Sequence, residues 1–165
     1  MAVEAAKTEL ALARSAGRLL RERGLTLAVA EGTTGGRIGE RLVRYPGASA
    51  FFKGGAVTYD YASRTALLGI PQSLLETHGA VSEEAVHAMA ASVRERLGAD
   101  IGLASSGIAG PAGGRSGRPV GLLWLALATG DGTFTLRHEL PWASRQRLQE
   151  RFTALALRML VEALA

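Results

Sequence analysis

Cysteine is absent from the 165-residue sequence. This absence excludes a disulfide framework, a zinc site built from thiolates and a cysteine nucleophile. No apolar run approaches the ~18 residues that a membrane-spanning helix needs. The first residues include Glu4 and Glu9 and lack the apolar stretch of a signal peptide. We therefore expect a cytoplasmic protein that has no membrane partner.

Lysine and aromatic residues are also scarce. Lys7 and Lys53 are the only lysines among 19 basic residues, and aromatic residues make up 5% of the chain. The net charge of +4 is spread along the sequence and not gathered in one basic block. Proteins that bind single-stranded nucleic acid combine a basic groove with aromatic side chains, and that pattern is missing. We therefore expect no nucleic-acid partner.

The histidines give no sign of a metal site. His78, His87 and His138 stand apart, without the H-x-x-x-H spacing that places two ligands on one helix face. The rest of the composition, 47% hydrophobic and 21% charged, is that of a globular protein. The length predicts a single domain, residues 1–165.

Predicted strands and helices alternate along the chain. Helices in such an alternation pack on the faces of a sheet, so the sequence predicts an α/β fold of three layers. Gly130-Asp131-Gly132 predicts a tight hairpin, which joins antiparallel strands and makes the sheet mixed. The predicted strands span residues 25–30, 56–59, 100–105, 120–129 and 133–140.

Two glycine-rich turns, 31–36 and 106–114, follow predicted strands. Ligands in α/β sheets bind at the carboxyl ends of the strands, so both turns are candidate sites. The alternative is that their glycines are ordinary turn residues with positive φ. Thr33 and Thr34 are candidate caps of the following helix, whose free N–H groups attract anions. Neither turn has a Walker A or dinucleotide-binding fingerprint.

Arg145 is a further candidate. It lies three residues before Leu148, in the first turn of the last predicted helix and near its buried face. Its guanidinium could clamp a phosphate, or the side chain could simply pack along its aliphatic stem. The sequence leaves both interpretations open.

Seven short segments between residues 30 and 121 occur in a fixed order, within a resemblance that extends from about residue 8 to 163. They are AEGTTGG at 30–36, PGAS at 46–49, GGAVTY at 54–59, LLGI at 67–70, HGAVSE at 78–83, SGIAGPAGG at 106–114 and PVG at 119–121. Together they resemble the C-terminal domain of the competence/damage-inducible protein CinA and its stand-alone form, nicotinamide-nucleotide amidohydrolase.

The resemblance implies an α/β/α domain with a mixed, mainly parallel five-stranded sheet. It implies hydrolysis of the carboxamide of nicotinamide mononucleotide to nicotinic acid mononucleotide and ammonia, without a cofactor. In the family, a serine in the first turn attacks the amide, a lysine removes its proton, and a tyrosine and an arginine help to hold the substrate. Family members form homo-oligomers, so we expect this chain to do the same.

The sequence departs from the family pattern at both catalytic positions. The serine position is Gly32 and the lysine position is Arg64. Glycine has no nucleophile, and arginine is too strong a base to be deprotonated at neutral pH. Tyr59 and Arg145 match the pattern, with Tyr59 at the catalytic centre and Arg145 on the substrate. The resemblance also implies further substrate-binding residues in the two glycine-rich turns. They are Thr33, Thr34, Gly35, Gly36, Ser106, Gly107, Ile108, Ala109 and Gly110.

Three hypotheses remain. The first, which we favour, is a non-catalytic member that keeps a pocket for a nucleotide resembling nicotinamide mononucleotide. Such a protein would bind that nucleotide, or regulate an active relative as a hetero-oligomer.

The second hypothesis is an active amidohydrolase with a rearranged nucleophile such as Thr33 and with Lys53 as base. The favoured role of Thr33, however, is a helix cap, and that of Lys53 is a solvated surface residue. The third is an interaction protein that keeps only the fold. If Arg64 points into the pocket, its planar fork suits a phosphate or a carboxylate.

Overall fold

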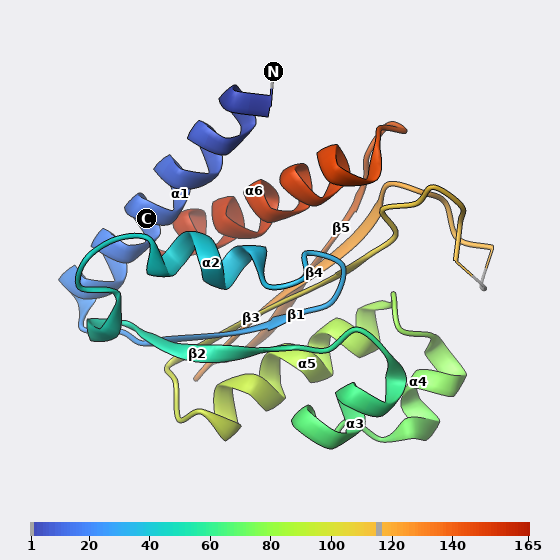
Figure 1. The fold of residues 1–165 in the computed structure, drawn as a ribbon. Helices are drawn as coiled ribbons and strands as arrows, with labels where there is room; N and C mark the ends of the chain where they lie inside the picture. Colours follow the sequence, from blue (N-terminus) through green and yellow to red (C-terminus); the bar gives the residue numbers. More distant parts are fainter. Residues whose placement is uncertain (1, 115–116) are drawn as a thin grey trace.

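A computed structural model describes residues 2–114 and 117–165 (Figure 1). Helices and strands alternate along this part of the chain. None of its helices is long and apolar enough to cross a membrane. The elements are α1 (Ala2–Arg23), β1 (Leu27–Glu31), α2 (Arg37–Val43), the short 3-10 helix η1 (Ala48–Ala50), β2 (Phe52–Val57), α3 (Tyr61–Leu68), α4 (Gln72–His78), α5 (Glu83–Arg96), β3 (Ile101–Gly107), β4 (Leu122–Thr129), β5 (Gly132–Glu139) and α6 (Arg145–Ala163).

In the described part of the chain, the five strands form one sheet in the order β2-β1-β3-β4-β5. β1 pairs in parallel with β2 and with β3, whereas the pairs β3–β4 and β4–β5 are antiparallel. β4 therefore runs against the direction that the other strands share. Thr129 pairs with Gly132, so the predicted hairpin turns through Gly130 and Asp131. The mixed five-stranded sheet is confirmed.

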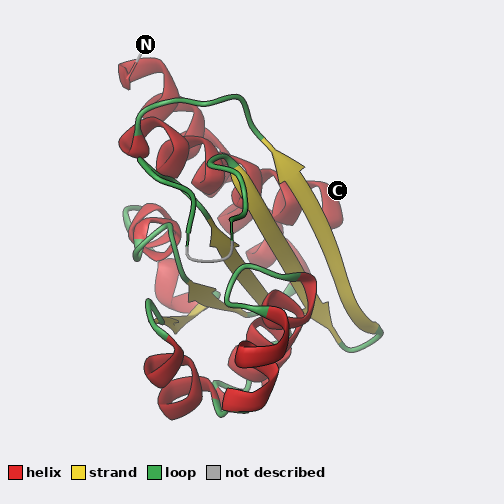
Figure 2. Ribbon diagram, turned by 90° about the vertical axis from the view of Figure 1, so that its right-hand side faces the viewer, coloured by secondary structure: helices red, strands yellow, loops and turns green. Residues whose placement is uncertain are grey.

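Helices cover both faces of the sheet (Figure 1; Figure 2). α1, α2 and α6 pack on one face, and α3, α4 and α5 pack on the other. Successive residues of a strand point to opposite faces, so each central strand contributes to two separate cores. Leu27, Val29 and Leu103 join the core with α1 and α6, whereas Ala28 and Ala104 join the core with α5. The predicted three-layer α/β/α architecture is confirmed.

Strand β2 begins earlier than the sequence predicts. Instead of residues 56–59, the strand spans Phe52–Val57 and includes Gly54 and Gly55. A Cβ atom on Gly55 would lie 2.5 Å from the carbonyl oxygen of Val29. Because only glycine allows this close approach to β1, the glycine pair belongs to the strand and not to a turn before it.

The turn after β1 is built around the buried carboxylate of Glu31. The N-cap residue of α2 is Gly36, which makes no side-chain cap hydrogen bond, so the prediction of a threonine cap is wrong. Glu31 instead satisfies the free N–H groups at the start of the helix, where a negative charge is favoured. Its carboxylate accepts hydrogen bonds from Thr34 Oγ1 (2.7 Å) and from the backbone nitrogens of Gly36 (3.1 Å), Ile38 (3.0 Å) and Gly39 (2.9 Å).

Replacing this carboxylate is expected to destabilise the fold. In Glu31→Gln, an amide NH₂ group would face backbone N–H donors inside the protein, so we expect a loss of about 2 kcal/mol in the free energy of unfolding. Urea denaturation measures it. Glu22→Gln is the matched control, because Glu22 is an exposed partner of Arg18 and its loss should cost less than about 0.5 kcal/mol. Equal losses in the two variants would contradict this role of Glu31.

Candidate functional site

A pocket of about 690 Å³ opens at the carboxyl ends of β1, β2 and β3. Five segments form its walls: the turn after β1, the β2–α3 connection with the start of α3, the α4–α5 connection, the loop after β3 and the first turn of α6. This edge of the sheet is where the sequence analysis expects a ligand, because α/β sheets bind ligands at the carboxyl ends of their strands.

Most predicted site residues line this pocket. They come from segments far apart in the sequence, and the pairing of β1 with β2 and β3 brings them together. The predicted residues in the lining are Gly32, Thr33, Tyr59, Arg64, Ser106, Gly107, Ile108, Ala109, Gly110 and Arg145.

Thr34, Gly35 and Gly36 were also predicted to contact the ligand, but the structure places them outside the lining. The buried Thr34 hydroxyl bonds to Glu31 and lies 2.8 Å from the Ser105 hydroxyl. Gly35 and Gly36 have φ values of 62° and 94°, which side chains rarely adopt, and they turn the chain into α2. These three residues therefore shape the turn that presents Gly32 and Thr33.

Several lining residues were not predicted from the sequence. Asp60, Tyr61 and Ala62 open α3, and the segment 79–81 belongs to the HGAVSE motif, which was noted without a role. Arg118 has no signal in its local sequence, because its contacts lie far away in the chain. It donates hydrogen bonds to the carbonyl oxygens of Val81 and His78, the latter at 2.6 Å, and so ties the loop after β3 to the α4–α5 connection.

Arg64 lies buried at the inner wall of the pocket, with 3% of its surface exposed. Its Nη1 donates to the carbonyl oxygen of Ala80, and its Nη2 donates to the hydroxyl of Ser106 at 3.0 Å. The Ser106 hydroxyl in turn donates to Ala80 at 2.7 Å. The Nε atom of Arg64 is buried without a hydrogen-bond partner among the described residues. Burial lowers the pKa of Arg64 to about 10, so the side chain still carries its charge at neutral pH.

Gly32 is the point at which Arg64 approaches the first turn. Its φ is not in the left-handed region, so its conformation is one that other residues also adopt. A Cβ atom on Gly32 would lie 3.0 Å from Arg64 Nη2 and 3.2 Å from the carbonyl oxygen of Ser105. The guanidinium therefore crowds the space that a side chain at position 32 would need, and the absence of a side chain there goes together with the long arginine at position 64.

Arg145 and Tyr59 meet at the exposed side of the pocket. Arg145 donates one hydrogen bond to the carbonyl oxygen of Gly110 at 2.8 Å and another to the hydroxyl of Tyr59. The guanidinium of Arg145 is therefore directed toward the pocket. The Tyr59 side chain lines the pocket and is exposed.

The lining carries an excess of positive charge. Arg64, Arg118 and Arg145 all contribute to it, and within the described residues none of them forms an ion pair with a carboxylate. Asp60 is the acidic residue of the described lining, and its carboxylate caps α3 by accepting from Ser63 N at 2.7 Å. That hydrogen bond lowers the pKa of Asp60. The pocket is thus suited to an anionic ligand.

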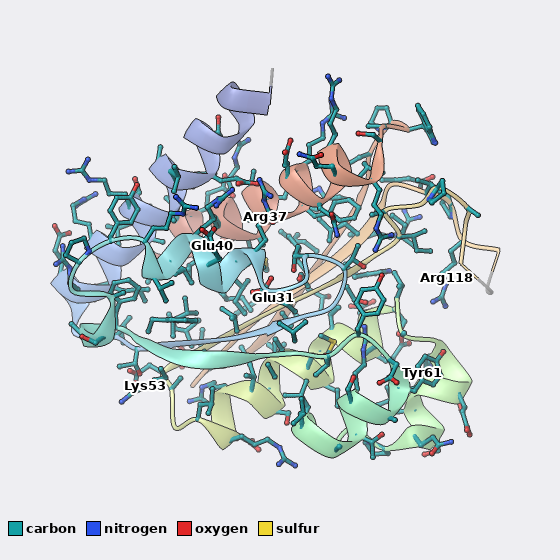
Figure 3. The ribbon with its side chains drawn as sticks, in the orientation of Figure 1. Glu31, Arg37, Glu40, Lys53, Tyr61 and Arg118 are labelled. Atoms are coloured by element: carbon teal, nitrogen blue, oxygen red, sulfur yellow. The ribbon has the colours of Figure 1, made fainter. Side chains whose placement is uncertain are left out.

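The groups considered for a rearranged active site do not come together. The Thr33 hydroxyl accepts from the N–H of Gly107 at 3.1 Å and donates to the Gly107 carbonyl oxygen, so it links the two glycine-rich turns. Lys53 is exposed near the beginning of β2 and is not in the lining; Figure 3 shows it far from Tyr61 and Arg118. Of the two, only Thr33 therefore lies in the lining.

Comparison with known proteins gives a consistent family assignment. The family model for the CinA C-terminal domain matches residues 9–164. A CinA-like protein of Syntrophus aciditrophicus is 47% identical over 147 residues, which cover 89% of this chain and 35% of the relative. A CinA-like protein of Shewanella denitrificans is 44% identical over 99% of this chain and 38% of the relative. The chain thus spans little more than a third of these relatives.

Solved structures have the same fold over nearly their whole length. A CinA superfamily protein from Klebsiella pneumoniae superposes with a TM-score of 0.91 at 31% identity, over 94% of this chain and 97% of that one. A competence/damage-inducible protein from Agrobacterium tumefaciens superposes with a TM-score of 0.86 at 35% identity, over 95% of both chains.

The contact between Gly32 and Arg64 predicts that substitutions at the two positions are coupled. The added Cβ in Gly32→Ala meets Nη2, and Arg64→Lys removes that atom. We expect the free energy of unfolding of the double variant to exceed the value obtained by adding the effects of the two single changes, by about 0.5 kcal/mol or more. Urea unfolding of the four proteins measures this coupling.

The matched control combines Arg64→Lys with Gly130→Ala. A Cβ on Gly130 meets only the end of the Arg94 side chain, at 3.9 Å, so these two changes should be additive. Additivity of Gly32→Ala with Arg64→Lys would mean that the guanidinium does not occupy the space beside Gly32.

Proposed function

This chain belongs to the CinA C-terminal domain family, and we propose that it is a member that binds a pyridine nucleotide without hydrolysing it. The observation that carries the proposal is the pocket at the carboxyl ends of the strands, in which Gly32 has no side chain and a buried arginine stands beside it. The size and charge of the pocket support ligand binding, and the residues at positions 32 and 64 support the absence of hydrolysis.

Hydrolysis of an amide through a covalent intermediate needs a nucleophile within hydrogen-bond reach of a base. Gly32 provides no nucleophile. Arg64 is protonated at neutral pH, because even its lowered pKa is about 10, so it cannot accept the proton. The neighbouring Ser106 hydroxyl accepts from Arg64 and donates to Ala80, and neither partner can act as a base. These contacts support the loss of chemistry.

Ligand binding is supported by the size and charge of the pocket. A volume of about 690 Å³ lies within the range of small-molecule sites, roughly 300–1,000 Å³. The guanidinium of Arg145 is available for a phosphate, and the exposed ring of Tyr59 is available for stacking on a pyridine. A protein of this kind would sense or sequester its nucleotide, as a homo-oligomer or in a hetero-oligomer with an active relative.

Ammonia release from nicotinamide mononucleotide tests the proposal. We expect no turnover by the natural protein and measurable turnover by Gly32→Ser/Arg64→Lys, which replaces both groups at once. Gly32→Ser alone is the control and should stay inactive, because Arg64 would still crowd the new hydroxyl and could not deprotonate it. Turnover by the natural protein would contradict the proposal, and Thr33→Val would then show whether Thr33 is the nucleophile.

A further inference from the structure

The most unusual group in the pocket is the buried guanidinium of Arg64. A buried positive charge is costly unless a negative charge or a full set of hydrogen bonds compensates it. Among the described residues, Arg64 has no carboxylate partner, and its two hydrogen-bond acceptors are the neutral oxygens of Ala80 and Ser106. Within the described part of the chain, this charge therefore has no counter-charge.

The guanidinium also has donors to spare. An arginine carries five N–H bonds, and the contacts with Ala80 and Ser106 engage one on each terminal nitrogen. Gly32 and Arg64 both line the pocket, and Nη2 lies 3.0 Å from the place that a Cβ of Gly32 would take, so the part of the pocket above Gly32 is directly beside an arginine donor. A ligand group in that space would meet a positive charge, and no side chain at position 32 would keep it away.

We infer that this space above Gly32 is a carboxylate subsite, so that the protein prefers the acid form of its ligand over the carboxamide. The inference rests on the proposed function and specifies which pyridine nucleotide the pocket selects. A carboxylate brings a negative charge and two acceptor oxygens in one plane, which matches the donors of a guanidinium. A carboxamide brings no charge and has one acceptor oxygen, and its NH₂ group would place N–H donors against the N–H donors of the guanidinium.

This preference places the protein after an amide-hydrolysing step. Hydrolysis of a pyridine carboxamide yields the corresponding carboxylate and ammonia. A protein whose pocket has an arginine beside a glycine at position 32 would recognise the carboxylate product of that class of reaction and not its carboxamide substrate. The pair of Gly32 and Arg64 thus accounts both for the proposed absence of amide hydrolysis and for the proposed preference for the acid form of the nucleotide.

Calorimetry with the full chain compares nicotinic acid mononucleotide with nicotinamide mononucleotide. We expect the acid form to bind about tenfold more tightly or better, since a hydrogen bond to a charged group is stronger than one to a neutral group. In Arg64→Met this ratio should fall to near one. Arg145→Met is the matched control: it should weaken both nucleotides alike and keep the ratio, because Arg145 contacts Gly110 and Tyr59 and is proposed to contact the phosphate that both nucleotides share.

The outcomes separate the two proposals. Equal affinities of the natural protein for the two nucleotides would overturn the carboxylate subsite and leave the proposed function standing. An absence of binding by both at millimolar concentration would overturn the proposed function and, with it, the subsite. If Arg64→Met does not fold, Arg64→Lys replaces it; the lysine lacks the planar pair of donors, so the ratio should still fall several-fold, and an unchanged ratio would overturn the subsite.

Discussion

The close approach of the Arg64 guanidinium to Gly32 is the constraint on which the character of this pocket depends. The arginine is held by the Ala80 carbonyl and the Ser106 hydroxyl, so it projects from α3 across to the turn after β1. A side chain at position 32 would compete with it for space. The two positions therefore have to be understood as a pair: a long, permanently charged side chain on one element and no side chain on the other. The inner wall of the pocket is therefore defined by the charge of Arg64 and the absence of a side chain at Gly32, and not by a nucleophile and a base.

The surrounding fold holds this pair in place because two neighbouring serines of β3 point to opposite faces of the sheet and make different contacts. Ser105 and Ser106 follow one another in β3, and strand alternation turns them to opposite faces of the sheet. Ser105 joins Thr34 beneath the first turn, where Glu31 closes the start of α2, while Ser106 holds Arg64 in the pocket. The carboxylate of Glu31 is thus internal and bonded to the protein, whereas the arginines of the pocket have no carboxylate partner among the described residues. An anionic ligand is the complement of such a site.

Local sequence signals were sufficient for most of the architecture. Ser82 and Ser144 cap α5 and α6, and Gly69 ends α3. Such caps and stops depend on residues within one helical turn, so the local sequence is enough to indicate them. The predicted pocket residues near β1, β3 and α6 also proved to share one cavity. Residues whose roles depend on distant contacts were missed: Glu31 caps a helix several residues away, and Arg118 reaches back to His78 and Val81. The start of β2 was misplaced because the need for Gly55 arises only when β1 lies beside it.

A crystal structure of the protein with nicotinic acid mononucleotide tests the central claim most directly. We expect the carboxylate of the nucleotide to lie above Gly32, within hydrogen-bond distance of Arg64 Nη2, and the phosphate to lie toward Arg145. A nucleotide bound with its phosphate at Arg64, or with its carboxylate in solvent, would contradict it.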